Sequence, residues 1–138
     1  MEEMTITITK LKKKLDAIFS KYKRLSEADE NGMVICITCG KRLHYKEAHN
    51  GHFVPRQILA TRFSEINTNV QCCGCNTYKD GEQYLHGKAI DFEYGEGTAD
   101  WLMSQPKDGF KIDKSDYEAM IDYYSYAVKY LLQTKGLE

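Results

Sequence analysis

The stretch VQCCGCNTYKDG, residues 70–81, decides the fold because it contains three of the five cysteines in the chain. The other two, Cys36 and Cys39, lie more than thirty residues upstream, with two residues between them. Cys72 and Cys75 are separated by the same gap. Two such pairs, a few tens of residues apart, supply the four thiolates of a tetrahedral structural zinc site. We therefore predict that these two pairs hold one structural Zn2+.

Cys73 is left over, because a single residue between it and Cys75 is a poor spacing for two ligands of one ion. The N-terminal sequence MEEMTITITK has no apolar core of signal-peptide length, and no long apolar run follows it. We expect a cytoplasmic protein without a membrane partner, and clustered cytosolic thiols bind metal more often than they form disulfides. The alternative is a set of buried reduced cysteines that pack as small hydrophobic side chains.

Charge is unevenly distributed along a chain whose net charge is −1. Residues 10–24 carry seven basic side chains and one acidic one, whereas residues 80–122 carry eleven acidic side chains and four lysines. The basic N-terminal half could bind phosphates, while the acidic segment 80–122 would repel them. Alternatively, the lysines only solvate a helix. The net charge itself neither favours nor excludes nucleic acid.

The apolar pattern predicts an α+β fold, and the length suits a single domain over residues 1–138. We divide the chain into an N-terminal basic helix at 10–27, a zinc-binding core at 33–95 and a C-terminal amphipathic helix at 113–135. In the core, MVICITCGKRLHY is typical of a strand, a knuckle and a returning strand.

Local signals predict where other elements begin and end. Residues 46–70 are mixed in composition and are expected to form loops. A helix is expected to begin in the second cysteine cluster, pass through Asn76 and Lys79, and be interrupted at Asp80-Gly81. Finally, Thr98 is a candidate cap for the segment ADWLM, Ser115-x-x-Glu118 is a capping box for the last helix, and Gly136 ends that helix.

The region around the knuckles contains side chains that a zinc ribbon alone does not require. Cleavage of a phosphodiester needs a base that activates water, a divalent ion that stabilises charge, and a rigid frame. His52 is a natural base because its neutral imidazole titrates near working pH, and Asn76 offers a hard oxygen to magnesium. The plainer alternatives are an ordinary loop histidine at His52, a turn cap at Asn67 and a helix N-cap at Asn76.

The order Cys-x-x-Cys, His, Asn, Cys-x-x-Cys, followed at once by a possible side-chain ligand, resembles the HNH, or ββα-metal, nucleases with an added zinc. The resemblance is strongest to the phage NinG/Rap recombination proteins. It is carried by SKYKRL (20–25), ITCGK (37–41), GHFVPR (51–56), TRFSEIN (61–67) and QCCGCNTYKDG (71–81), and covers about residues 10–97. The recombination endonuclease VII group is more distantly similar, in its two zinc knuckles and in an Asn directly after the last cysteine.

The resemblance implies a zinc-stabilised ββα-metal (HNH, treble-clef-like) core with flanking N- and C-terminal helices. It also implies an HNH-type endodeoxyribonuclease that acts on branched recombination intermediates, such as Holliday junctions or D-loops, during phage-type recombination in a bacterial host cell. The expected partners are branched DNA, host or phage recombination proteins and a second copy of the chain. In the family pattern His52 is the catalytic base, Asn67 holds the loop, and Asn76 binds the catalytic Mg2+ or Mn2+.

The chain departs from the HNH pattern at Gly51, where most of these enzymes have an Asp or His that serves as a second metal ligand. Glycine has no side chain to coordinate an ion. His49, Glu47 or Asp80 could replace the ligand, or water and DNA phosphate could complete the shell of a magnesium ion. His52 could itself be a ligand rather than the base.

Arg56, Arg62 and Lys79 are predicted to contact the phosphate backbone, with surface solvation as the alternative, especially for Arg62. His44 and His86 match no part of the pattern, so we interpret both as structural or surface residues. Two other functions remain compatible with the sequence. One is a non-catalytic zinc-stabilised nucleic-acid-binding module, in which Gly51 marks a lost metal site. The other is a zinc scaffold for protein interactions.

Overall fold

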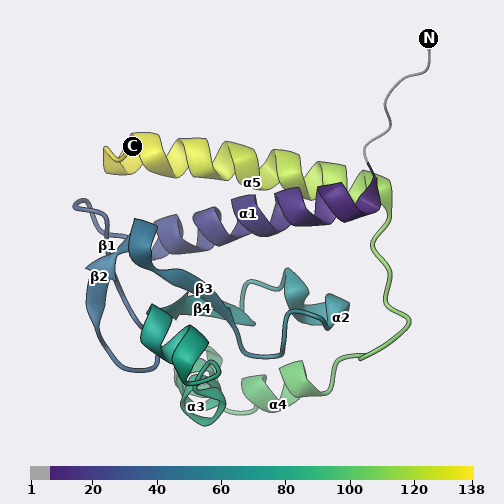
Figure 1. The fold of residues 1–138 in the computed structure, drawn as a ribbon, viewed down its shortest axis with the longest axis horizontal. Coiled ribbons are helices and arrows are strands. Elements are labelled where there is room, and N and C mark those ends of the chain that lie inside the picture. The colour runs from purple at the N-terminus through teal and green to yellow at the C-terminus, as the bar shows by residue number, and fades with distance from the viewer. Residues whose placement is uncertain (1–6) are drawn as a thin grey trace.

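The computed structural model describes residues 7–138 and has the α+β architecture that the sequence predicts. Two long helices, α1 (Ile8–Glu27) and α5 (Lys114–Lys135), lie side by side, with two small sheets and the shorter helices beneath them (Figure 1). The other elements are β1 (Met33–Ile35), β2 (Arg42–His44), η1 (Tyr45–Glu47), β3 (His49–His52), α2 (Leu59–Arg62), β4 (Thr68–Gln71), η2 (Gly74–Tyr78), α3 (Gln83–Tyr94) and α4 (Thr98–Met103). Across residues 7–138, each helix is too short or too polar to cross a membrane.

Helix α1 packs along α5, and the two helices run in the same direction (Figure 1). The interface is formed by the buried side chains Leu11, Leu15 and Phe19 of α1 and Tyr117, Ile121 and Tyr124 of α5. The rings of Phe19 and Tyr124 meet edge to face, with centroids 5.0 Å apart. At the far end of the pair, Lys135 Nζ donates to the carbonyl of Leu25 at 2.8 Å. The apolar side of the basic helix is therefore part of the core.

The capping box predicted at Ser115 is wrong, because the N-cap of α5 is Asp113. The Asp113 carboxylate accepts a hydrogen bond from Asp116 N at 2.9 Å, and Ser115 Oγ donates to the same carboxylate at 2.9 Å. A charged carboxylate is favoured at this end because it also meets the positive end of the helix dipole. Gly136 ends α5 in a left-handed conformation, as predicted.

Two antiparallel hairpins form the sheets. In the first, β1 and β2 flank the first knuckle, with Val34 opposite Leu43. In the second, β3 pairs with β4 and places His52 opposite Thr68. All of β3 and most of β4 lie in the stretch 46–70, so the prediction of loops there was wrong. Their sequences, HNGH and TNVQ, are mostly polar and lack the apolar alternation that identifies a strand.

The helix predicted from the second cysteine cluster through Lys79 is a single π-helical turn, η2, which ends at Tyr78. Asp80, Gly81 and Glu82 follow with φ angles of 49°, 82° and 49°, and α3 begins after them. Three left-handed residues in a row cannot continue a right-handed helix. The predicted interruption at Asp80-Gly81 is therefore confirmed.

The cap predicted at Thr98 is also wrong, because Gly97 occupies the N-cap position of α4. Thr98 Oγ1 donates backwards to the carbonyl of Gly95 at 2.7 Å. The first turn of α4 is instead satisfied by Asp91 of α3, whose carboxylate accepts from Ala99 N at 2.8 Å. A side chain from the preceding helix thus replaces the local cap.

His86 of α3 is fully buried beneath the second hairpin. The Asn69 amide donates to His86 Nε2 at 3.0 Å, and the imidazole packs edge-on against Phe53. Within the described residues, His86 Nδ1 has no hydrogen-bond partner. Burial, with a smaller effect from nearby His52, lowers the pKa of His86 from 6.5 to about 4.

We predict that acid destabilises the protein through His86. Because the pKa is lower in the folded chain, neutral His86 contributes stability above pH 6.5 that is lost as the pH falls from 6.5 towards 4. Urea unfolding at pH 7 and pH 5 measures this loss. His86→Gln should depend less on pH than the wild type, whereas His44→Gln should keep the wild-type dependence. Equal pH dependence in His86→Gln and the wild type would contradict the prediction.

Candidate metal centre and cleft

The four predicted zinc ligands come together at one point. Cys36 and Cys39 come from the knuckle between β1 and β2, and Cys72 and Cys75 come from the end of β4 and the start of η2. The four sulfur atoms lie within 4.8 Å of one another, and the Sγ atoms of Cys39 and Cys72 are 3.7 Å apart. Four Zn–S bonds of about 2.3 Å in a tetrahedron place the sulfurs about 3.8 Å apart. The cluster therefore fits a zinc ion.

The surroundings of the cluster favour the deprotonated thiolate form at Cys36. Burial raises the pKa of the Cys36 thiol, but hydrogen bonds from Thr38 and from backbone N–H groups outweigh it and lower the pKa to about 6. Burial raises the pKa of Cys75 to about 12. Cys73 is exposed and is not part of the cluster, so its assignment as the spare cysteine is confirmed.

A cleft of about 510 Å³ lies between α1 and the turn that follows η2. Its lining includes His52, Asn76, Asp80, Arg56 and Asn50, together with Asp16 and Ser20 of α1. The structure thus brings His52 and Asn76 to the same cleft from elements more than twenty residues apart. Asn50 Oδ1 is buried and has no hydrogen-bond partner within the described residues.

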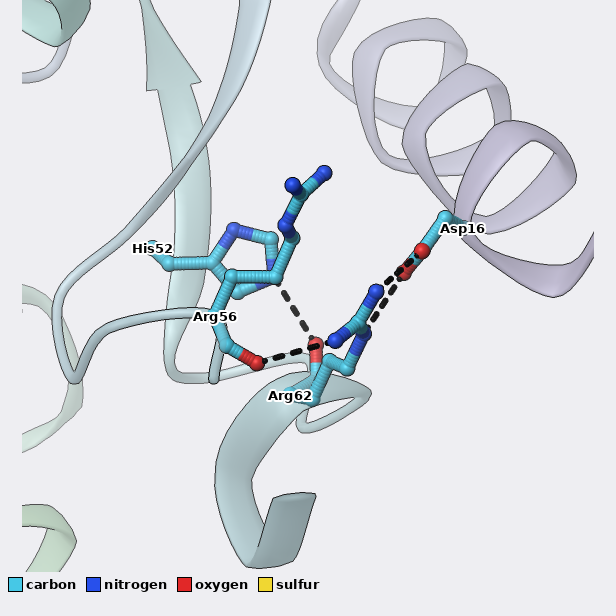
Figure 2. A network of polar contacts seen from close by, with 4 residues as sticks. All are labelled: Asp16, His52, Arg56 and Arg62. Atoms are coloured by element: carbon cyan, nitrogen blue, oxygen red, sulfur yellow. Dashed lines mark hydrogen bonds and ion pairs between the residues drawn. The ribbon is translucent and has the colours of Figure 1, made fainter. Parts of the chain in front are cut away.

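His52 is held in one orientation at the end of β3. Its Nε2 lies 3.0 Å from the carbonyl oxygen of Arg62 (Figure 2). A carbonyl can only accept, so Nε2 carries the proton and Nδ1 keeps a lone pair. Burial lowers the pKa of His52, against the raising effect of the Arg62 carbonyl, so the imidazole is neutral at neutral pH.

Asn67 is fully buried and closes the long connection between β3 and β4. Its Oδ1 accepts from Val54 N at 2.8 Å, and its Nδ2 donates to the carbonyls of Val54 and Thr61, each at 3.1 Å. All three bonds are made within the loop that carries the Arg62 carbonyl. Asn67 therefore fixes the shape of the loop against which His52 is held.

Asn76 and His49 are side by side. Asn76 Nδ2 lies 2.9 Å from His49 Nδ1, so the amide donates to the ring and its Oδ1 remains as an acceptor. Among the other candidate ligands, Asp80 lines the cleft, whereas Glu47 lines a different cavity near Cys73. Asp80 is exposed at its left-handed turn. The arrangement therefore brings an amide oxygen and a carboxylate to the cleft.

The space beside Gly51 is filled by Gln71, a residue that the sequence analysis missed. A Cβ atom at Gly51 would meet the Gln71 side chain far inside van der Waals contact. Gln71 is fully buried, and its Nε2 donates to Thr38 Oγ1 at 3.2 Å and to the Gly81 carbonyl at 2.8 Å. The side chain of Gln71 thus links the first knuckle to the turn beside the cleft, and position 51 has no room for a metal-binding side chain.

The three predicted DNA-binding residues differ in their surroundings. Arg56 is exposed and lines the cleft, and Lys79 is exposed directly after η2. Arg62 is half-buried, and its guanidinium pairs with the carboxylate of Asp16. Contacts of all three with DNA stay predictions, and the ion pair of Arg62 is a structural role that the sequence did not indicate.

A comparison with protein families gives one match. A family model described as "Bacteriophage Lambda NinG protein" matches residues 5–134. The chain belongs to the NinG family. The resemblance drawn from the cysteine pairs and the motifs between them is thereby confirmed at the level of the family. Comparisons with curated proteins and with solved structures gave no match.

We predict that zinc binding in this NinG-family chain depends on Cys39 and not on Cys73. Both side chains are exposed, so Cys39→Ser and Cys73→Ser disturb packing to a similar degree. Cys39→Ser should lose most of the bound zinc and unfold at a lower temperature, because structural zinc contributes folding free energy directly. Cys73→Ser should keep about one zinc per chain. Metal analysis and thermal unfolding test this, and equal zinc content in the two variants would contradict it.

We also predict that Gly51→Ala destabilises the fold by about 1–3 kcal/mol, because the new methyl group overlaps Gln71. Gln71→Ala combined with Gly51→Ala should recover part of that loss, since the two changes share one space. Gly74→Ala is the matched control, because its Cβ makes only an ordinary contact with Cys72 Sγ at 3.7 Å. Denaturant unfolding of these three variants and of Gln71→Ala alone measures the coupling, and additive effects would refute the overlap.

Proposed function

We propose that this NinG-family chain is a metal-dependent DNA endonuclease of HNH type that acts on branched recombination intermediates, such as Holliday junctions or D-loops, in phage-type recombination. The observation that carries the proposal is that His52 and Asn76 line one cleft, with Asp80 beside them. A nitrogen base and hard oxygen donors can therefore act on the same phosphate group. Membership of the NinG family supports the phage setting.

In this proposal His52 is the general base. Its Nδ1 lone pair accepts a proton from the attacking water, while Nε2–H stays bonded to the Arg62 carbonyl. The lowered pKa keeps the imidazole unprotonated at neutral pH, so the base is available. Asn67 acts indirectly, by holding the loop that positions His52.

Asn76 Oδ1 and the Asp80 carboxylate are the groups that would hold a catalytic Mg2+ or Mn2+, and DNA phosphate and water would complete the shell. When bound, such an ion supplies charge stabilisation at the phosphorus and at the leaving oxygen. His49 supports Asn76 by accepting its amide hydrogen, which leaves the amide oxygen unused. Direct binding of the ion by His49 is the less favoured arrangement, because its Nδ1 is already engaged.

The four-cysteine cluster is proposed to hold a structural zinc rather than the catalytic ion. Cys75 precedes Asn76 directly, so the same turn that presents a thiol to the cluster presents an amide to the cleft. The zinc would thereby fix the position of Asn76 relative to His52. Rigid support of this kind keeps reacting groups in place before substrate binds.

The lysines of α1 are proposed to guide a DNA arm into the cleft. Lys10, Lys13 and Lys14 are exposed, and Lys13 lies one turn before Asp16 on the helix face that also carries Ser20. Both ion pairs found within residues 7–138 involve arginines, so these ammonium groups have no carboxylate partner there. A basic helix face that borders the cleft suits a phosphate backbone. Arg56 continues this charge inside the cleft.

The principal alternative is a non-catalytic zinc-stabilised nucleic-acid-binding module. It is favoured by one observation, that Gly51 and the overlying Gln71 exclude the usual second ligand. Both functions predict DNA binding, so cleavage decides between them. For the endonuclease we further propose that two copies act together on a four-way junction, with host or phage recombination proteins as partners in the bacterial cytoplasm.

We predict cleavage of a four-way junction or D-loop in Mg2+ or Mn2+, and none in EDTA. His52→Ala should reduce the single-turnover rate by about 10²–10⁴-fold, because it removes the base, while DNA affinity persists. His44→Ala is the matched control, since His44 lies in the first hairpin outside the cleft. Intact branched and linear DNA under every divalent ion tested would favour the non-catalytic module.

We predict that the lysine face of α1 contributes to DNA affinity. Replacing Lys10, Lys13 and Lys14 together by Gln should weaken binding of a four-way junction in EDTA by about tenfold or more at low salt. It should also reduce the slope of log K against log salt by about 2–3, because three phosphate contacts are lost. The control replaces three exposed lysines outside α1, Lys88, Lys111 and Lys129. Fluorescence anisotropy measures both, and equal losses in the two variants would refute the assignment.

A further inference from the structure

Arg62 is held by hydrogen bonds from every part of its guanidinium. Nε and Nη2 donate to the two carboxylate oxygens of Asp16, at 2.9 Å and 2.5 Å, and Nη1 donates to the carbonyl of Arg56 at 3.2 Å. The side chains of Arg62 and Asp16 are only 15% and 22% exposed. Bidentate pairing fixes both distance and orientation, and partial burial limits screening by salt. The pair therefore anchors Arg62 to α1.

The backbone of the same residue holds His52. The Arg62 carbonyl is the acceptor for His52 Nε2–H, and it lies at the C-terminal end of α2 (Figure 2). Helix α2 has only four residues and no side-chain cap, so one isolated turn cannot fix its own position. Its last residue is placed instead by the Arg62 side chain and by Asn67, which binds the carbonyl of Thr61.

We infer that Arg62 is a positioning residue for His52, and that Asp16 of α1 is its anchor. This inference rests on the proposed function, in which His52 is the base. It makes the N-terminal helix one wall of the site, rather than only a flank that binds DNA. It also assigns Arg62 a role different from the phosphate contact that the sequence suggested.

The charges around His52 are consistent with this role. Asp16 is the one acidic side chain among residues 10–24, and it lines the cleft. An unpaired carboxylate there would repel a DNA phosphate, and the Arg62 guanidinium neutralises it. The other charged or titratable groups near His52 are Arg56 and His86. The guanidinium of Arg56 points away from the Asp16–Arg62 pair, so Arg56 is the arginine free to meet a phosphate (Figure 2).

Asp16→Asn tests the inference, because it keeps the size of the side chain and removes its charge. The single-turnover cleavage rate should fall by about 10–100-fold, as expected when a reacting group is misplaced. The zinc content should stay unchanged, the affinity for junction DNA in EDTA should not fall, and the variant should remain folded at the assay temperature. Asp16→Glu keeps the negative charge on a side chain that is one methylene longer. Its cleavage rate should lie between the rates of the wild type and Asp16→Asn.

Asp29→Asn is the matched control. It breaks the other Asp–Arg pair of the described structure, between Asp29 and Arg42, which is exposed and lies outside the cleft. Cleavage by Asp29→Asn should equal that of the wild type. Arg62→Gln gives a second check, since a positioning role lowers the cleavage rate, whereas a phosphate contact mainly weakens DNA affinity.

The ring of His52 provides a readout that does not require nuclease activity. Nitrogen-15 NMR of the imidazole should show the Nε2–H tautomer in the wild type and in Asp29→Asn, and loss of that single tautomer in Asp16→Asn. An unchanged tautomer together with an unchanged cleavage rate in Asp16→Asn would overturn the inference. So would unfolding of Asp16→Asn, which would make the pair a purely structural one. If the wild type cleaves no DNA while Asp16→Asn loses the Nε2–H tautomer, the endonuclease is refuted and the positioning role of Arg62 remains supported.

Discussion

The convergence of the four cysteines joins two hairpins that are too small to be stable alone. Strands of three and four residues in isolated pairs have little independent stability in water. One sulfur pair comes from the turn of the first hairpin, and the other directly follows the last strand of the second. Gln71 adds a second tie, from that strand to Thr38 in the first knuckle. The same Gln71 amide binds the Gly81 carbonyl. The turn that carries Asp80 is thus linked to the cluster by side-chain contacts as well as by the chain.

The second hairpin has a polar interior. This explains both its well-defined geometry and the absence of a clear strand pattern in its sequence. Asn67, Thr68 and Asn69 are buried in succession, and Gln71 follows with no exposed surface. Each of these amides makes at least one hydrogen bond inside the protein, although Gln71 Oε1 has no partner within the described residues, and a buried polar network of this kind specifies one geometry at some cost in stability. Apolar periodicity cannot reveal such a strand, because hydrogen bonds rather than hydrophobic contacts select its residues.

The features that the sequence predicts well are those set by short-range rules. The spacing of Cys36 to Cys39 and of Cys72 to Cys75 identifies the cluster, and repeats of three and four residues identify α1 and α5. It is harder to predict which of two similar side chains caps a helix, as with Asp113 and Ser115 at the start of α5. The pairing of Asp16 with Arg62 spans 46 residues. It follows from packing of α1 on the second hairpin, for which the sequence contains no local signal.

The parallel pairing of α1 and α5 has a consequence for the order in which the protein is assembled during translation. Helix α1 leaves the ribosome before α5, and the part of its apolar stripe formed by Leu11, Leu15 and Phe19 lacks its α5 partners until Tyr117, Ile121 and Tyr124 have been synthesised. A nascent chain that has already gathered both cysteine pairs therefore still lacks α5, the helix that packs along α1, and α1 forms one wall of the cleft. Completion of the site is delayed until the last helix is made, which separates the closing of the metal knuckles from the maturation of the cleft.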